Sequence, residues 1–223
     1  SVDNVTGGLY VKALPSVFVQ AEDYYKRYRN LRQHETAVGR PRASGSLLLA
    51  PWLHDNTADA RGLELMLRSR LGPVQGTFGY TLSRVEIRNP DLNGGRAFRA
   101  EWDRTHQVTG HLEVPLASGV SAGVLWLFAT GTPNALAATD PAERATLPAY
   151  HRLDLSVHYR RAFAGVAVEA RATLFNAYDR DNTWYRSPLL VPDTAQRPPR
   201  LTSVNVDVYD LGLQPSFSVG VDF

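Results

Sequence analysis

The 223-residue chain is 43% hydrophobic and 21% charged, an ordinary balance that excludes a globally disordered protein. Its net charge of +2 is too small to indicate a polyanionic partner, and the basic residues lie among acidic ones, so nucleic-acid binding is not expected. The absence of cysteine excludes disulfides, thiolate zinc sites and cysteine nucleophiles. No apolar run approaches the ~18 residues of a membrane helix, which leaves a soluble all-β protein or a membrane β-barrel.

Alternation of apolar and polar residues with a period of two predicts an all-β, antiparallel fold of about nine strands. They are expected at 5–14, 16–31, 58–72, 74–88, 102–116, 119–131, 150–162, 165–179 and 209–223. Globular strands usually have ~5–6 residues, whereas a tilted membrane-spanning strand needs ~9–11. Because most of these strands reach ten residues, their length favours a transmembrane barrel over a soluble sandwich.

The connections between the expected strands alternate strictly between short and long. The long ones cover about 32–57, 89–101, 132–149 and 180–208. Bacterial outer-membrane barrels have short periplasmic turns and long extracellular loops. The pattern therefore predicts that the long loops are extracellular and that the C-terminus is periplasmic. An odd number of strands also predicts that earlier strands exist in a longer parent chain or on another chain.

Aromatic residues near the strand ends fit the girdles that flank the lipid-facing band of such barrels, although strands in general are rich in aromatics. They include Tyr24, Tyr25 and Tyr28 in one strand and Trp126 and Phe128 in another. Asp23 departs from the apolar phase of its strand. It is expected either to lie beyond the hydrocarbon or to follow a β-bulge.

Seven segments stand out as motifs: Tyr24–Leu31 (YYKRYRNL), Ala60–Leu65 (ARGLEL), Gly76–Ser83 (GTFGYTLS), Trp102–His106 (WDRTH), Tyr150–Leu155 (YHRLDL), Leu174–Tyr178 (LFNAY) and the closing Pro215–Phe223 (PSFSVGVDF). They resemble elements of the barrels of TonB-dependent outer-membrane receptors. The resemblance covers nearly the whole chain, and the order and spacing of the motifs make it more specific than any single motif.

The resemblance implies a 22-stranded barrel closed by an N-terminal plug domain and energised through TonB. Residues 1–223 would be the C-terminal segment of that barrel, with the plug and the N-terminal strands absent. The implied partners are outer-membrane lipid, the rest of the same receptor, TonB acting through the absent plug, and a surface lipoprotein. The terminal Phe223 would form part of the signal that the barrel assembly machinery reads.

The long loops carry the candidate ligand-binding residues, because Trp, Tyr and Arg are common anchors of binding surfaces. They are Trp52 and His54 in the first long loop, and Trp184, Tyr185 and Arg186 in the last one. The alternative is that these side chains simply pack as a cap over the barrel.

Catalysis, a metal site and a cofactor are not expected. Neither His106 and His111 nor His151 and His158 are in phase on a strand, and no Gly-x-Ser-x-Gly sequence occurs. Asp103 and His106 lie close enough in sequence to pair, but a structural cap explains them equally well. The expected function is ligand uptake across the outer membrane, with an adhesion barrel without transport and an outer-membrane enzyme as alternatives.

Overall fold

The computed structural model describes residues 1–34, 52–90, 92–134, 144–193, 195 and 200–222, and for residues 33–34, 52–55, 188, 193, 200 and 203 it describes the backbone alone. Almost every element in these ranges is a β-strand. A search of the same ranges finds no helix with the length and apolar character to cross a membrane.

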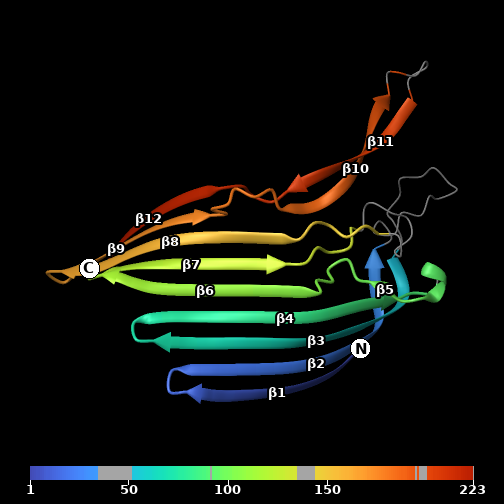
Figure 1. Ribbon diagram of the computed structural model, residues 1–223. Helices are drawn as coiled ribbons and strands as arrows, with labels where there is room; N and C mark the ends of the chain where they lie inside the picture. The colour runs from blue at the N-terminus through green and yellow to red at the C-terminus, as the bar shows by residue number, and fades with distance from the viewer. Residues whose placement is uncertain (35–51, 91, 135–143, 194, 196–199, 223) are drawn as a thin grey trace.

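Nine strands follow one another in chain order across one continuous antiparallel sheet (Figure 1). They are β1 (Val2–Leu14), β2 (Val17–His34), β3 (Trp52–Leu71), β4 (Val74–Arg88), β6 (His106–Ala117), β7 (Val120–Ala129), β8 (Tyr150–Phe163), β9 (Val166–Phe175) and β12 (Gln214–Asp222). The sheet is open, with β1 and β12 as its two edges. The nine predicted strands are confirmed, and each overlaps its predicted range.

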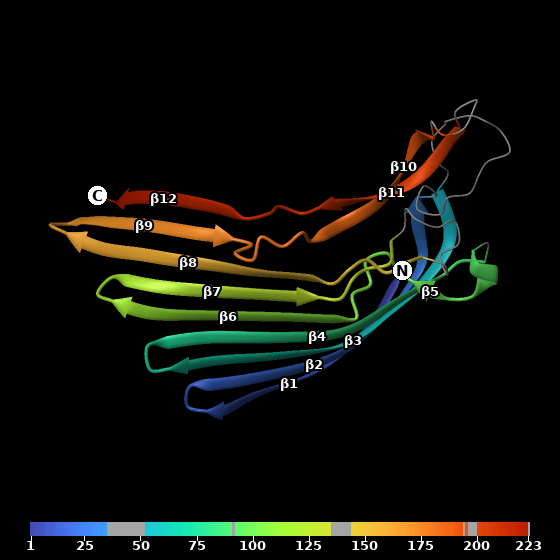
Figure 2. The same ribbon diagram turned by 45° about the horizontal axis from the view of Figure 1, so that its top comes forward.

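The short connections all lie at one end of the sheet and the long ones at the other (Figures 1 and 2). At the short end, β8 and β9 are joined through Ala164 and Gly165, whose φ angles are 49° and 87°. Positive φ at both central residues is typical of a type I′ turn, whose twist matches that of the flanking strands. This tight turn fixes the register that continues along both strands.

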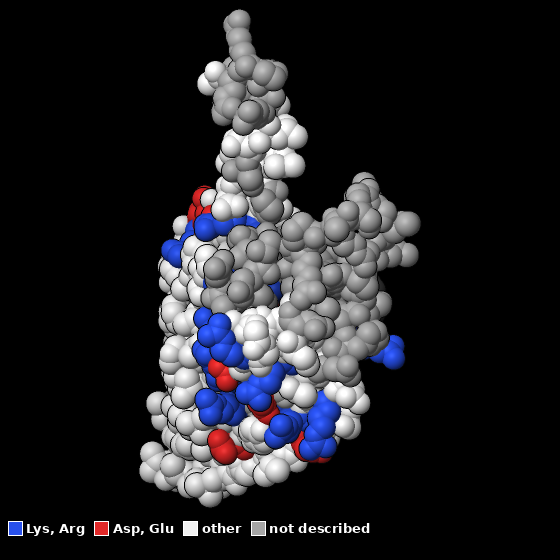
Figure 3. Space-filling view, turned by 90° about the vertical axis from the view of Figure 1, so that its right-hand side faces the viewer, with Lys and Arg blue, Asp and Glu red and all other residues white. Residues whose placement is uncertain are grey.

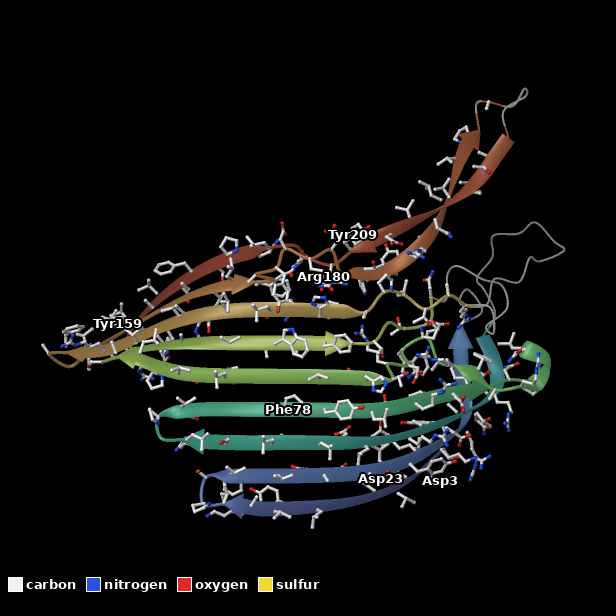
Figure 4. All side chains as sticks on the ribbon, viewed as in Figure 1. Asp3, Asp23, Phe78, Tyr159, Arg180 and Tyr209 are labelled. Carbon is white, nitrogen blue, oxygen red and sulfur yellow. The ribbon has the colours of Figure 1, made fainter. Side chains whose placement is uncertain are left out.

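The register gives the sheet an apolar face and a polar face. Val124, Leu155 and Leu174 are adjacent on the apolar face across three strands. One residue earlier along β8, Asp154 lies on the polar face, where it pairs with Arg152 at 3.0 Å. Phe78 and Tyr159, labelled in Figure 4, belong to the apolar face by the same register.

No described part of the chain covers the apolar face. Leu155 is 39% exposed, Val157 48% and Phe217 72%. Monomeric soluble proteins rarely expose contiguous apolar patches larger than a few hundred Å². An apolar face that extends over nine strands therefore needs a further apolar medium or partner to cover it.

A small core lies at the long-loop end, on the polar side of the sheet. The segment after β4 folds back through a single 3-10 turn, Asn93–Gly95, and the short strand β5 (Phe98–Arg99), which pairs with β4. Its side chains pack with those of β3 and β4 in a buried cluster of Ala58, Ile87, Leu92, Phe98 and Ala100. The strand predicted from residue 102 therefore begins only at His106, because residues 100–105 belong to this packed loop.

The prediction that 180–208 is a loop is wrong in one respect, because most of this segment forms a β-hairpin. Strands β10 (Thr183–Asp193) and β11 (Arg200–Tyr209) pair with each other in a separate two-stranded sheet that projects beyond the long-loop end (Figures 1 and 2). Arg180 and Tyr209 mark its base in Figure 4. The final strand accordingly begins at Gln214 and not at residue 209.

Buried asparagines hold the base of the hairpin to β8 and β9. The Asn182 side chain accepts a hydrogen bond from the His151 amide and donates one to the His151 carbonyl, both at 3.0 Å. Asn176, within the LFNAY motif, has a φ of 51° and donates to the carbonyls of Arg180 and Leu211. These contacts satisfy backbone groups that the irregular junction would otherwise leave without partners.

Candidate functional site

A cavity of about 520 Å³ opens on the polar side of the sheet at the long-loop end, and we call it the mouth pocket. It is lined by Tyr24, Lys26, Tyr28, Leu31, Arg32, Asn56, Ala58, Ala60, Val85, Ile87 and Trp102. Most of these residues come from β2, β3 and β4, and Trp102 comes from the packed loop. Its size is within the ~300–1,000 Å³ of typical small-molecule sites.

The period of β2 places three of these side chains together, since Tyr24, Lys26 and Tyr28 are two residues apart along one face. A bulge then shifts the register between Tyr28 and Leu31, at Asn30, whose φ is 56°. The extra residue brings Leu31 to the same side as Tyr28, so that both line the pocket. The girdle interpretation is therefore wrong for Tyr24 and Tyr28, which lie on the polar side.

Gly62 creates the space in which the Tyr24 ring lies. The two residues are opposite each other in the β2–β3 register. A Cβ atom at Gly62 would lie 2.6 Å from the Tyr24 hydroxyl oxygen and 2.7 Å from the Leu82 carbonyl oxygen, both too close for any side chain. Glycine in the ARGLEL motif is thus required by the close approach of an aromatic ring to the backbone.

Asp103 anchors the loop that carries Trp102. Its carboxylate is fully buried and accepts hydrogen bonds from the Val85 amide and from Arg99 Nε, each at 2.7 Å. His106 does not pair with it but contacts the Tyr80 hydroxyl through Nδ1 at 2.9 Å. The structural interpretation of Asp103 is the one that these contacts support, because they tie the loop to β4. Trp102 itself is 58% exposed at the pocket rim.

The lining of the mouth pocket combines aromatic rings with positive charge. Lys26 Nζ lies 4.9 Å from the centre of the Tyr24 ring, and Arg32 is a second cation of the lining. No Asp or Glu is among the described lining residues. Such a set can bind a planar or aromatic anion, because rings supply stacking area and cations supply charge-assisted hydrogen bonds.

The structure describes the side chains of three of the five ligand-binding candidates expected from the sequence. Trp52 and His54 belong to β3, but the structure describes only their backbone and not their side chains. Trp184, Tyr185 and Arg186 follow one another along β10. The Trp184 and Tyr185 rings meet edge to face with centroids 5.4 Å apart, and Trp184 is 71% exposed.

Arg186 has a structural role in the hairpin. Its guanidinium forms a bidentate pair with Asp207 on β11, with the second Nη2–Oδ2 contact at 2.8 Å. The Arg186 carbonyl accepts a hydrogen bond from Asn134 Nδ2 at 3.0 Å, which connects the hairpin to the loop after β7. These bonds engage the guanidinium on the cross-strand partner, whereas the rings of Trp184 and Tyr185 stay exposed to solvent.

The hairpin is expected to loosen in acid. The hydrogen bond and charge of Arg186 lower the pKa of Asp207 below its ordinary value of 3.8. A carboxyl whose folded pKa is lowered contributes stability above its unfolded pKa and loses it as the pH falls through the folded pKa. The protection factors of the β10–β11 amides, which are exchange rates corrected for the intrinsic rate at each pH, should therefore fall below about pH 4, and Asp207→Asn should remove most of this pH dependence. Unchanged acid dependence in the variant would contradict this role for the pair.

No group of three or more His, Asp or Glu side chains is arranged to hold a metal ion within the described residues. Isolated polar contacts occur instead, such as that between His158 Nε2 and Glu169 Oε1 at 2.8 Å on the polar face.

Comparison with known proteins finds no matching family model and no matching curated protein. Solved structures do match. The FrpB iron transporter from Neisseria meningitidis matches 99% of the chain with a TM-score of 0.64 at 12% identity. BauA, the ferric preacinetobactin receptor from Acinetobacter baumannii, matches 100% with a TM-score of 0.61 at 13% identity. The outer-membrane ferripyoverdine receptor of Pseudomonas aeruginosa matches 98% with a TM-score of 0.60 at 14% identity.

The chain spans only part of these proteins, 30% of FrpB, 29% of BauA and 26% of the ferripyoverdine receptor. At such low sequence identity the likeness establishes the fold. It agrees with the resemblance to TonB-dependent receptors that the sequence motifs carry. The chain has the fold of part of the β-barrel found in outer-membrane receptors and transporters for iron and its complexes.

Proposed function

We propose that the chain is the C-terminal part of the barrel of a TonB-dependent receptor that takes up a ligand across the outer membrane. The observation that carries this proposal is the nine-strand sheet itself, with an uncovered apolar face and with all its long loops gathered at the end where the mouth pocket opens. The fold shared with outer-membrane receptors supports it.

In this proposal the apolar face contacts lipid and the polar face lines the lumen. The ion pairs of both signs on the polar face, such as Arg152–Asp154, suit a wide aqueous interior. The short turns lie in the periplasm and the long loops and the β10–β11 hairpin outside the cell. Asp222, the last described residue, is then periplasmic, as expected for the C-terminus.

The ligand is first captured by the extracellular elements. Trp184 and Tyr185 present exposed rings on the hairpin, and Trp52 and His54 remain candidates at the start of β3. The mouth pocket forms the next site, at the point where the loops meet the lumen. Its rings and cations favour an anionic, aromatic ligand, a class that includes catecholate complexes of ferric iron.

Transport requires parts beyond residues 1–223. The remaining strands would close the barrel between β1 and β12, because an unpaired strand edge is not tolerated in lipid. A plug domain would couple the barrel to TonB, and a surface lipoprotein remains a candidate partner. Phe223 lies outside the described residues, and its role as an assembly signal stays a prediction from the sequence.

Replacement of Trp102 tests the mouth pocket. Trp102→Ala removes the largest ring at the pocket rim and should weaken binding of a ferric tris-catecholate chelate about tenfold or more, as for other aromatic anchors. The measurement is saturation binding and uptake of the radiolabelled iron chelate by cells that express the full-length receptor.

The matched control for this test is Trp126→Ala, since Trp126 lies on the apolar face away from the pocket and stacks on Phe128. It should leave the affinity unchanged once surface levels are equalised. A receptor that binds the chelate but accumulates none, with or without TonB, would select the adhesion barrel. Equal affinities of the Trp102 variant and the parent for a transported chelate would exclude the mouth pocket as the binding site.

A further inference from the structure

The apolar face changes abruptly to a charged surface along β2, β3 and β4. On β3 and β4 the opposed residues Leu63 and Leu82 are followed, toward the long-loop end, by Arg61 opposite Arg84. The next opposed pair on the same face is Asp59 and Glu86. Figure 3, which views the long-loop end, shows basic and acidic side chains gathered together on the surface.

Arg61 and Arg84 form a cross-strand pair of like charge. Like charges directly opposite on adjacent strands are destabilising unless other charges compensate them. Arg84 is compensated, because its Nη2 lies 2.9 Å from Glu86 Oε1. Arg61 is exposed and forms no ion pair or hydrogen bond with any described residue. An anion bound beside Arg61 would offset the excess positive charge of the Arg61–Arg84 pair.

None of the acidic residues around Arg61 pairs with it in the described part of the structure. Asp59 accepts a hydrogen bond from the Tyr25 hydroxyl at 2.6 Å and lies 3.9 Å from Arg27. Asp23 is opposite Leu63, at the last level of the apolar band, and forms no ion pair with a described residue. Further along β1 and β2, Asp3 pairs with Arg29. Figure 4 shows Asp23 and Asp3 in this order along the two strands.

The level of Arg61 matches the edge of a bilayer. From Leu71 to Leu63 the apolar-face positions of β3 extend over ~27 Å of strand, which a tilt of about 40° reduces to ~21 Å of height. The lipid-facing band of outer-membrane barrels is ~25 Å tall. Arg61 and Arg84 follow immediately after Leu63 and Leu82, so they lie where lipid headgroups begin.

We propose that Arg61 and Arg84 bind the phosphate of a lipid headgroup in the outer leaflet of the membrane. This inference rests on the proposed function, because it requires that the apolar face contacts lipid with the loops outside. Guanidinium groups suit the task, since their planar donors can bind phosphate oxygens in pairs. Arg27 supplies a third guanidinium on the adjacent strand. Glu86 pairs with Arg84, and Asp59 lies 3.9 Å from Arg27.

The test compares phosphorylated and dephosphorylated lipid. The purified full-length receptor is inserted into phosphatidylcholine vesicles that contain bisphosphorylated lipid A or the same lipid without phosphates, and its thermal unfolding is followed. The phosphorylated lipid should raise the melting temperature of the parent receptor more than the dephosphorylated one. The double variant R61Q/R84Q should lose at least half of that difference.

The matched control is R68Q/R70Q, because Arg68 and Arg70 lie on the same strand as Arg61, and Arg68 lines the polar side of the sheet. It should retain the full response to lipid phosphate. An equal response in R61Q/R84Q and the parent, or equal effects of the two lipids on the parent, would overturn the inference while leaving the proposed function intact. A receptor that fails to insert into any vesicle would overturn both.

Discussion

Leu155→Arg is expected to destabilise the barrel by about 2–4 kcal/mol, the cost of an arginine on the lipid face near the bilayer midplane. Leu155 lies in the middle of β8 with Val124 and Leu174 beside it on the neighbouring strands, so the guanidinium would have only apolar neighbours and lipid. The measurement is the free energy of unfolding in liposomes, from urea titration followed by tryptophan fluorescence or by mobility on gels.

The control is the adjacent position on the opposite face. Ser156 lines a groove of about 430 Å³ on the polar face, together with Asp154 and His158. Ser156→Arg should therefore cost much less than Leu155→Arg. Val168→Arg should also be milder, about 0–1 kcal/mol, because Val168 is close to the short-turn end of β9 and the penalty falls toward the membrane surface. Equal damage at Leu155 and Ser156 would show that the two faces are assigned wrongly.

Periodicity identified the strands because burial or lipid contact on one face imposes a strict period of two. Leu153, Leu155 and Val157 alternate with polar residues throughout β8, and the structure reproduces that alternation as two faces. The same reasoning could have placed Tyr24 and Tyr28 correctly, since they are in phase with Glu22 and Lys26 on the polar side. Aromatic type alone suggests girdle residues, whereas their phase along the strand assigns Tyr24 and Tyr28 to the polar face.

The β10–β11 hairpin was missed for a physical reason. Pro188 and Pro192 lie within β10, and proline in an alternating run normally argues against a strand because it cannot donate to the ladder. Among the described strands β10 pairs with β11 alone, so its other edge has no described ladder that the prolines would interrupt. Isolated edges of this kind tolerate proline, and the sequence alone does not reveal which edges are free.

The mouth pocket depends on contacts that no local pattern encodes. The bulge at Asn30 turns Leu31 into the pocket, and the loop after β4 brings Trp102 to a rim formed by β2 and β3. The one sequence signal was the WDRTH motif, in which Asp103 precedes the strand. The role of this motif follows from the hydrogen bonds that Asp103 accepts from the Val85 amide and from Arg99, and these bonds are visible only in the structure.

Asp103→Ala is expected to destabilise the loop of residues 98–105 against local opening by about 2–4 kcal/mol, because it removes charge-assisted hydrogen bonds and leaves the Val85 amide and Arg99 without their buried acceptor. The loss should be local, since these bonds hold residues 98–105 to β4. Hydrogen exchange should rise in this loop and in the adjoining end of β4, while β8 and β9 keep their protection.

The same variant should weaken ligand binding, because Trp102 directly precedes Asp103 and would lose its fixed position at the pocket rim. Affinity for the ferric tris-catecholate chelate should fall by a factor similar to that for Trp102→Ala, and the double variant should add little to either single change. Asp181→Ala is the matched control, an exposed aspartate in another long connection, and it should change neither stability nor affinity. Asp103→Ala with an intact loop and unaltered affinity would show that the carboxylate does not position the pocket. Full additivity with Trp102→Ala would show that the two residues act independently.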